Sequence, residues 1–151
     1  MELADEIVIN APRDRVYAAL NDPEILKQCI PGCEELIMHS PTELEAKVVL
    51  KVGPVKARFT GKVTLDTTNA PGGFSLTGEG SGGPAGFARG GADVTLVEAE
   101  PGVTTLSYTA KAEIGGKLAQ LGSRLIQGTA KKLSASFFEK FAATFENEAA
   151  A

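Results

Sequence analysis

The sequence has no tryptophan, one histidine and only two cysteines in 151 residues. Such a small supply argues against a structural zinc site, which usually takes four Cys or His ligands. Cys29 and Cys33 lie four residues apart, and in a cytoplasmic chain a disulfide is not expected. We expect two reduced thiols in small buried or turn positions, with redox chemistry as the less favoured alternative. The sequence thus predicts neither a metal nor a cofactor.

Basic residues are also in deficit, with 15 Lys and Arg against 19 Asp and Glu, for a net charge of −4. A nucleic-acid-binding protein needs a basic face, so no such partner is expected. No apolar run approaches the ~18 residues of a membrane span, and Glu2, Asp5 and Glu6 interrupt any secretory signal. We expect a cytoplasmic protein, either free or held peripherally at the inner face of the membrane. The length predicts a single domain, over residues 1–148, with a tail at 149–151.

Hydrophobic periodicity divides the chain into three parts. Residues 2–9 are typical of a first strand, and Pro12 and Asp22-Pro23 then mark the starts of two short helices. Apolar residues alternate with polar ones from Glu34 to Ile114, which is the pattern of antiparallel strands with one dry face. After Gly115-Gly116 the spacing becomes helical, in Leu118, Leu121, Leu125, Thr129, Leu133, Phe137, Phe141 and Phe145.

These parts together predict an α+β fold. A curved antiparallel sheet of about seven strands would wrap around one long helix from about Gly116 to Glu146. Gly122 and Gly128 are positions at which this helix could bend or approach a neighbour closely.

The most informative feature is the small size of the dry-face residues on the later strands. Interiors are close-packed, so glycine and alanine facing a bulky helix either draw the helix in or leave a cavity. Alternatively, the glycines are bulges of a strongly bent sheet, and both can hold at once. We predict an apolar ligand pocket, with Tyr108 as its one polar group, formed by Phe59, Val63, Gly78, Gly80, Ala92, Tyr108, Ala110, Ala112, Leu121, Gly122, Leu125 and Leu133.

Catalytic groups are scarce in the sequence. The GxGxxG pattern at Gly78, Gly80 and Gly83 is followed by proline and a strand, whereas a dinucleotide site needs a helix there. His39, beside Ser40-Pro41, is expected to be a solvated turn residue. We therefore predict no catalytic residue and a protein that is not an enzyme.

The C-terminal helix region is locally basic. Its cations outnumber Glu113 and Glu139, and are Lys111, Lys117, Arg124, Lys131, Lys132 and Lys140. Such a helix can contact anionic lipid or an acidic partner. The simpler alternative is a solvated face over a core stripe, which the sheet needs for its cover.

Five segments of the sequence together are typical of one known family: residues 11–24, Cys29-Ile-Pro-Gly-Cys33-Glu, Val52-Gly-Pro, Gly61-Lys-Val and residues 115–126. They resemble the family of the carbon monoxide dehydrogenase G subunit, which belongs to the START-like helix-grip (SRPBCC) superfamily, and the similarity covers essentially the whole chain. The resemblance implies an accessory protein that binds quinone or lipid in its cavity. It further implies a molybdenum-containing hydroxylase as partner, and a role in membrane recruitment or electron transfer to quinone. A helix-grip enzyme, a cyclase or hydrolase acting on an apolar substrate, is the alternative.

Overall fold

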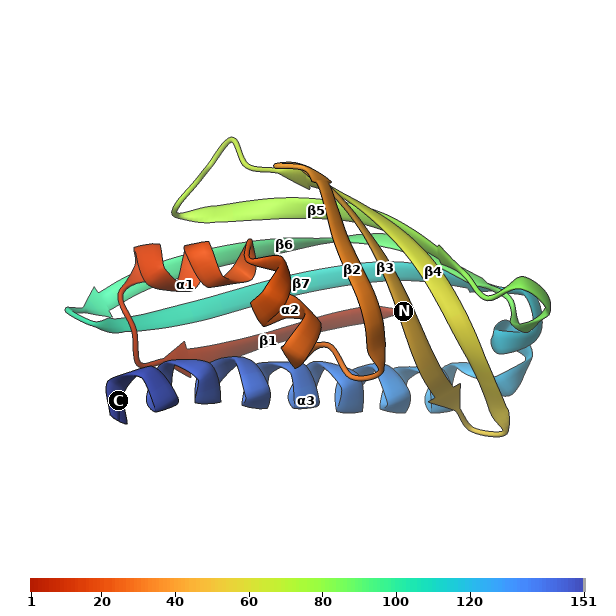
Figure 1. The fold of residues 1–151 in the computed structure, drawn as a ribbon. Helices are drawn as coiled ribbons and strands as arrows, with labels where there is room; N and C mark the ends of the chain where they lie inside the picture. Colours follow the sequence, from red (N-terminus) through yellow and green to blue (C-terminus); the bar gives the residue numbers. More distant parts are fainter. Residues whose placement is uncertain (151) are drawn as a thin grey trace.

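The computed structural model describes residues 1–150, with side chains through Glu146. Its elements follow the predicted order, with two short helices after the first strand and one long helix at the end (Figure 1). They are β1 (Glu2–Ile9), α1 (Arg13–Leu20), α2 (Pro23–Cys29), β2 (Cys33–Ser40), β3 (Glu43–Val52), β4 (Val55–Asp66), β5 (Gly73–Ser81), the 3-10 turn η1 (Gly83–Ala85), β6 (Phe87–Glu100), β7 (Val103–Gly115), the 3-10 helix η2 (Gly116–Leu121) and α3 (Ser123–Ala150). Of the predicted tail at 149–151, Ala151 lies outside the described residues.

The sheet has seven strands in the order β1-β7-β6-β5-β4-β3-β2, and every neighbouring pair is antiparallel. It curves around α3, which runs along its open side (Figure 1). The amide of Gln127 in α3 donates to the carbonyl of Glu2 in the edge strand β1, at 2.7 Å. This arrangement confirms the predicted helix-grip fold.

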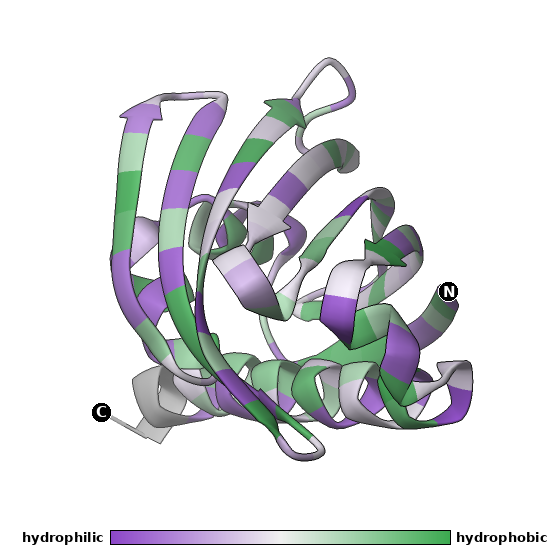
Figure 2. Ribbon diagram, turned by 90° about the vertical axis from the view of Figure 1, so that its right-hand side faces the viewer, coloured by the Kyte–Doolittle hydropathy of each residue, from purple (hydrophilic) through white to green (hydrophobic). Residues whose placement is uncertain are grey.

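Strand register confirms which residues share the concave face. Leu65, Leu76, Ala92, Ala110 and Leu3 are successive partners across five strands. Along β4, exposure alternates with each residue, as expected for a sheet with one dry and one wet face. Figure 2 shows the matching alternation of hydrophobic and hydrophilic residues along the strands.

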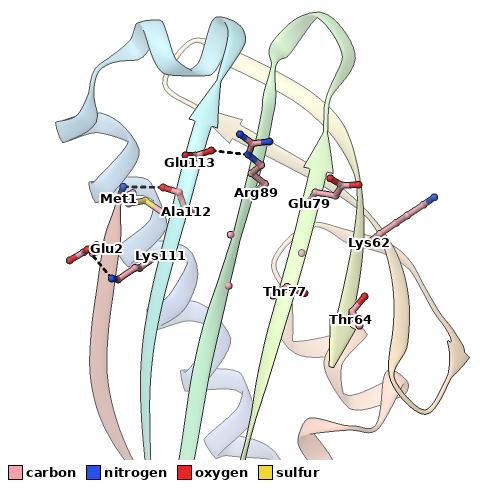
Figure 3. Close-up of a pocket in the computed structure, with 13 residues that line it drawn as sticks. Met1, Glu2, Lys62, Thr64, Thr77, Glu79, Arg89, Lys111, Ala112 and Glu113 are labelled. Carbon is pink, nitrogen blue, oxygen red and sulfur yellow. Dashed lines mark hydrogen bonds and ion pairs between the residues drawn. The ribbon is translucent and has the colours of Figure 1, made fainter. Parts of the chain in front are cut away.

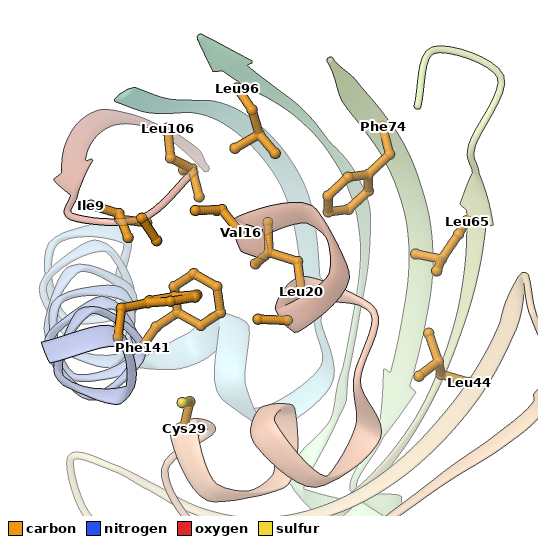
Figure 4. Close-up of a cluster of buried hydrophobic side chains, with 13 residues drawn as sticks. Ile9, Val16, Leu20, Cys29, Leu44, Leu65, Phe74, Leu96, Leu106 and Phe141 are labelled. Atoms are coloured by element: carbon orange, nitrogen blue, oxygen red, sulfur yellow. The ribbon is translucent and has the colours of Figure 1, made fainter. Parts of the chain in front are cut away.

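The densest packing lies at one end of the groove, beneath α1 and α2 (Figure 4). Phe141 of α3 is fully buried there together with Val16 of α1 and Leu106 of β7. The one buried polar side chain among the described residues, Thr104, donates to the carbonyl of Ala11 at 2.7 Å. This bond joins β7 to the segment that leads into α1.

The long helix starts later than predicted. Residues 116–121 form η2 instead, and Gly122 follows with φ of +94° and ψ of 147°, a conformation open to glycine that separates η2 from α3. In the first turn of α3, Leu125 is 39% exposed while its neighbour Ile126 lines the cavity side of the helix. The predicted apolar stripe is therefore wrong at Leu125, but it holds at Leu118 and Thr129 and from Leu133 to Phe145.

Candidate functional site

A cavity of about 380 Å³ lies between the first half of α3 and the facing ends of β3 to β7. It occupies the end of the groove away from the dense core. Its size is within the range of about 300–1,000 Å³ that is usual for small-molecule sites. The lining residues are Met1, Ile30, Pro31, Ala46, Val48, Leu50, Val52, Phe59, Gly61, Gly80, Ala88, Ile114, Leu118, Ile126, Thr129, Ala130 and Leu133.

Nearly all of this wall is apolar. Thr129 carries the only polar side chain among the described lining residues, and its hydroxyl donates to the carbonyl of Leu125 at 2.9 Å. That hydroxyl is thus already bonded within its own helix. A ligand seated here would be held by burial of apolar surface and not by side-chain hydrogen bonds.

The cavity exists because two glycines face it where the core end has large side chains. Gly61 in β4 and Gly80 in β5 are partners in the register. Neither has a positive φ, and a Cβ added at either one would come no closer than 3.6 Å to its neighbours. Further along the same two strands towards the core, the large side chains of Leu65 and Phe74 are buried. The missing side-chain volume at Gly61 and Gly80 is therefore empty space.

Other positions of the sheet are glycine for a different reason. A Cβ at Gly90 would collide with the carbonyl of Lys111 in β7, and one at Gly73 with the carbonyl of Val94 in β6. These positions need glycine for close approach of neighbouring strands, as the bent-sheet interpretation expected. Both interpretations of the glycines apply, at different residues.

The connection from α2 to β2 closes one side of the cavity. Ile30 and Pro31 line it directly, and Gly32 follows with φ of +75°. The carbonyl of Gly32 accepts from Val49 N–H at 2.9 Å, and a Cβ at Gly32 would overlap the Val49 carbonyl. The segment Cys29–Cys33 is thus a structural clamp on β3 that presents two apolar side chains to the cavity.

Three of the predicted pocket residues, Phe59, Gly80 and Leu133, line this cavity. Val63, Ala92 and Ala110 share the concave face but lie away from the cavity wall, and Val63 packs against the core. Gly78 is the register partner of Val63, and Ala112 of Gly90, so these two also belong to the concave face outside the cavity wall. The cavity wall does not include Leu121, Gly122 or Leu125 either.

Tyr108 lies outside the cavity too. Its ring stacks on Phe138 of α3, with centroids 5.2 Å apart, and it borders a separate groove between β1 and α3. The cavity residues missed in the sequence come chiefly from β3, with others from the α2–β2 connection, η2 and α3. The CIPGC motif was a signal for Ile30 and Pro31, whereas nothing in the sequence favoured Ile126 over Leu125 as a cavity residue.

The outer face of the sheet carries a shallow polar hollow over Gly78, Gly90 and Gly91 (Figure 3). Its rim has alternating charges, and Arg89 Nε lies 2.7 Å from Glu113 Oε2. Both side chains of this pair are largely exposed. This surface carries solvent-exposed charged side chains on neighbouring strands, and surface ion pairs of this kind contribute little stability.

Both cysteines are free thiols. Burial raises the pKa of Cys29, opposed by a hydrogen bond with Thr144 and by the charge of Lys140. Burial likewise raises the pKa of the Cys33 thiol, so neither is an activated nucleophile.

His39 lies within β2, not in a turn as predicted, and its Nε2 is 2.9 Å from Glu45 Oε2. That contact lowers the pKa of Glu45. Within the described residues, no three His, Cys, Asp or Glu side chains gather as metal ligands. None of the helices described here has the length and hydrophobicity to cross a membrane.

Comparison with known proteins places the chain within one family. A family model for CoxG, the G subunit of carbon monoxide dehydrogenase, matches residues 6–145. No curated protein matches the sequence. A conserved protein from Geobacillus kaustophilus is similar in structure, with TM-score 0.90 and 29% identity over 97% of this chain and 96% of that one.

More distant structures share the fold. A START superfamily protein from Mycobacterium smegmatis has TM-score 0.74 and 10% identity, over 97% of both chains. The Zhui aromatase/cyclase from Streptomyces sp. R1128 has TM-score 0.74 and 12% identity, over 99% of this chain and 95% of that one. At these identities the likeness concerns the fold alone.

Proposed function

Because this chain belongs to the CoxG family of carbon monoxide dehydrogenase, we propose that it is an accessory protein that holds an apolar ligand in the cavity between α3 and the sheet. The observation that carries the proposal is the wall itself. It is apolar throughout except for Thr129, whose hydroxyl is bonded to Leu125. Burial of apolar surface contributes roughly 25 cal/mol per Å², so such a wall favours a hydrocarbon or prenyl tail.

Quinone and lipid are the two ligand classes that combine such a tail with a compact head. The cavity, at about 380 Å³, offers an apolar wall to the tail of either. We further propose that the protein serves a molybdenum-containing hydroxylase of the carbon monoxide dehydrogenase type, in membrane recruitment or in electron transfer to quinone. The family membership supports this partner.

A catalytic role is the second candidate, since one structure of the same fold is an aromatase/cyclase. Acid–base catalysis needs a titratable group within hydrogen-bond reach of the substrate. Among the described cavity residues there is no carboxylate, histidine, lysine, cysteine or tyrosine side chain. The wall therefore favours binding over catalysis.

The experiment is ligand titration, supported by native mass spectrometry of protein taken directly from its expression host. We expect an apolar molecule to co-purify. We also expect saturable binding of two probes, a fluorescent C18 polyene fatty acid and a benzoquinone with a decyl tail. Binding of neither probe, with no co-purified molecule, would contradict the proposed function. Chemical conversion of a bound probe would instead support the second candidate, a catalytic role.

A further inference from the structure

Basic residues are concentrated in two stretches of the chain that contain no acidic residue. The first runs between Glu45 and Asp66 and the second between Glu113 and Glu139. They hold nine of the 15 Lys and Arg residues and none of the 19 Asp and Glu residues, namely Lys47, Lys51, Lys56, Arg58, Lys62, Lys117, Arg124, Lys131 and Lys132. In a chain with net charge −4, this is a strong local segregation of charge.

The fold brings the middle of the first stretch against the start of the second. The first forms the β3–β4 hairpin, and the second forms η2 and the first half of α3. A Cβ placed on Gly53, at the hairpin tip, would lie 2.7 Å from Leu125 Cδ2, so the tip rests on α3. Both lie at the right-hand end of the molecule in Figure 1, which is the end that contains the cavity.

Four cations at this end form no ion pair with the carboxylates that the structure describes. Lys47 and Arg58, further from the tip, pair with Glu35 and Glu34 at 3.1 and 2.7 Å. Within the described chain, by contrast, no ion pair involves the four exposed side chains nearest the tip and the helix start, Lys51, Lys56, Lys117 and Arg124.

Apolar groups lie among these cations. Leu125 is 39% exposed, although its helix neighbour Ile126 lines the cavity. Pro54 at the hairpin tip is exposed as well. At the opposite end, β6 carries Glu98 and Glu100 where it leads into the β6–β7 turn (Figure 1). The charge of the molecule is thus polarised along its length, and at the cavity end Leu125 and Pro54 are exposed among the cations.

We propose that the cavity end, defined by Lys51, Lys56, Lys117, Arg124 and Leu125, docks on the surface of an anionic lipid bilayer. Cations near such a surface are attracted to its headgroups, and an apolar side chain among them inserts at the boundary. The proposal rests on the proposed function, because a cavity with an apolar wall exchanges its ligand most directly with an apolar phase. The acidic turn at the other end would repel the same surface and so orient the protein.

An acidic protein surface would also attract these cations. It would not account for Leu125 and Pro54 exposed among them beside an apolar cavity. A bilayer supplies both the anionic charge and the apolar phase, and for this reason we commit to the bilayer. Binding to an acidic protein is left as an outcome of the test.

The test is co-sedimentation with vesicles of phosphatidylcholine alone and of phosphatidylcholine mixed with phosphatidylglycerol. The quadruple variant K51E/K56E/K117E/R124E is compared with a control of equal charge change at exposed lysines elsewhere, K27E/K62E/K111E/K140E. We expect the wild type to bind only the mixed vesicles, and less at high salt. The quadruple variant should bind at least about tenfold more weakly and the control within about twofold of wild type. Leu125→Ser should weaken binding without changing its salt dependence.

Equal losses in the quadruple variant and the control, or no binding to the mixed vesicles, would overturn the docking proposal. So would binding to polyglutamate that matches binding to vesicles, because it would assign the surface to an acidic protein. Titration with the fluorescent fatty acid, without vesicles, separates this result from the proposed function. The quadruple variant should take up that probe as the wild type does, so a failed titration would count against the cavity and not against the docking surface.

Discussion

Gly61 and Gly80 lie opposite each other in β4 and β5, and neither backbone requires glycine. The nearest neighbour to a Cβ at Gly80 would be the Thr60 carbonyl oxygen, at 3.7 Å, which is an ordinary van der Waals contact. The absence of two side chains here is therefore a property of the cavity and not of the sheet.

Replacing Gly80 with leucine should abolish probe binding while the fold survives. The new side chain would fill the cavity, and cavity-filling substitutions commonly add about 0.5–2 kcal/mol of stability. Fatty-acid titration and a thermal melt measure the two effects. Thr77→Leu, on the outer face of the same strand, is the matched control and should bind normally. Unchanged binding with lost stability in Gly80→Leu would show that this space is packed core.

Changing Tyr108 to phenylalanine should leave probe binding unchanged, because its ring stacks on Phe138 outside the cavity. Removing the hydroxyl preserves that stacking contact. The measurement is the same titration with the decyl benzoquinone. A clear loss of affinity would return Tyr108 to the role of polar group predicted from the sequence.

Gly32→Ala should destabilise the protein more than Gly102→Ala does. Both glycines are left-handed, with φ of +75° and +79°, so each substitution carries the backbone cost of about 1–2 kcal/mol. Only at Gly32 would the added Cβ also overlap a backbone atom, the Val49 carbonyl oxygen, whereas nothing lies within 4 Å at Gly102. Urea unfolding measures the difference. Equal losses would refute the clamp between Gly32 and β3.

Phe141→Ala should cost about 3–5 kcal/mol of stability, because Phe141 is fully buried in the dense core. Leu133 already borders the cavity on one side, so Leu133→Ala should cost less stability, and it should alter probe affinity. Denaturant unfolding and titration of both variants check this division of α3 into a core half and a cavity half. A larger loss of stability in Leu133→Ala than in Phe141→Ala would contradict it.

The Cys29 thiol should make stability fall at alkaline pH. Its pKa is raised in the folded protein by burial, above the ordinary value of 9.0. The unfolded chain therefore loses this proton first, and stability declines as pH rises from about 9 towards the folded pKa. Comparing urea unfolding of wild type and Cys29→Ser across that range tests the effect, and the variant should show a shallower decline. A thiol reagent at neutral pH should also modify Cys29 slowly, since it is 1% exposed.

Local pattern predicted much of this protein. The alternation in β3 and β4 identified their dry face correctly, because successive strand side chains point to opposite sides. The helix start at Asp22-Pro23 was also correct, and Asp22 accepts a hydrogen bond from Glu24 N–H at 3.0 Å. Phe141 and Phe145 were assigned to the buried stripe because helical spacing places them on one face.

Tertiary structure decided where the space between these faces stays empty. Gly80 and Ala110 have the same orientation in the sequence pattern, yet only Gly80 borders the cavity. The parity of a residue in a strand says which face it is on, but not how far along the groove large side chains from other elements fill it. Helical spacing likewise placed Leu125 on the inward stripe with Thr129 and Leu133. In the structure α3 meets the tip of the β3–β4 hairpin at Leu125 and the cavity at Ile126, because the elements packed around a helix decide which contact each of its side chains makes.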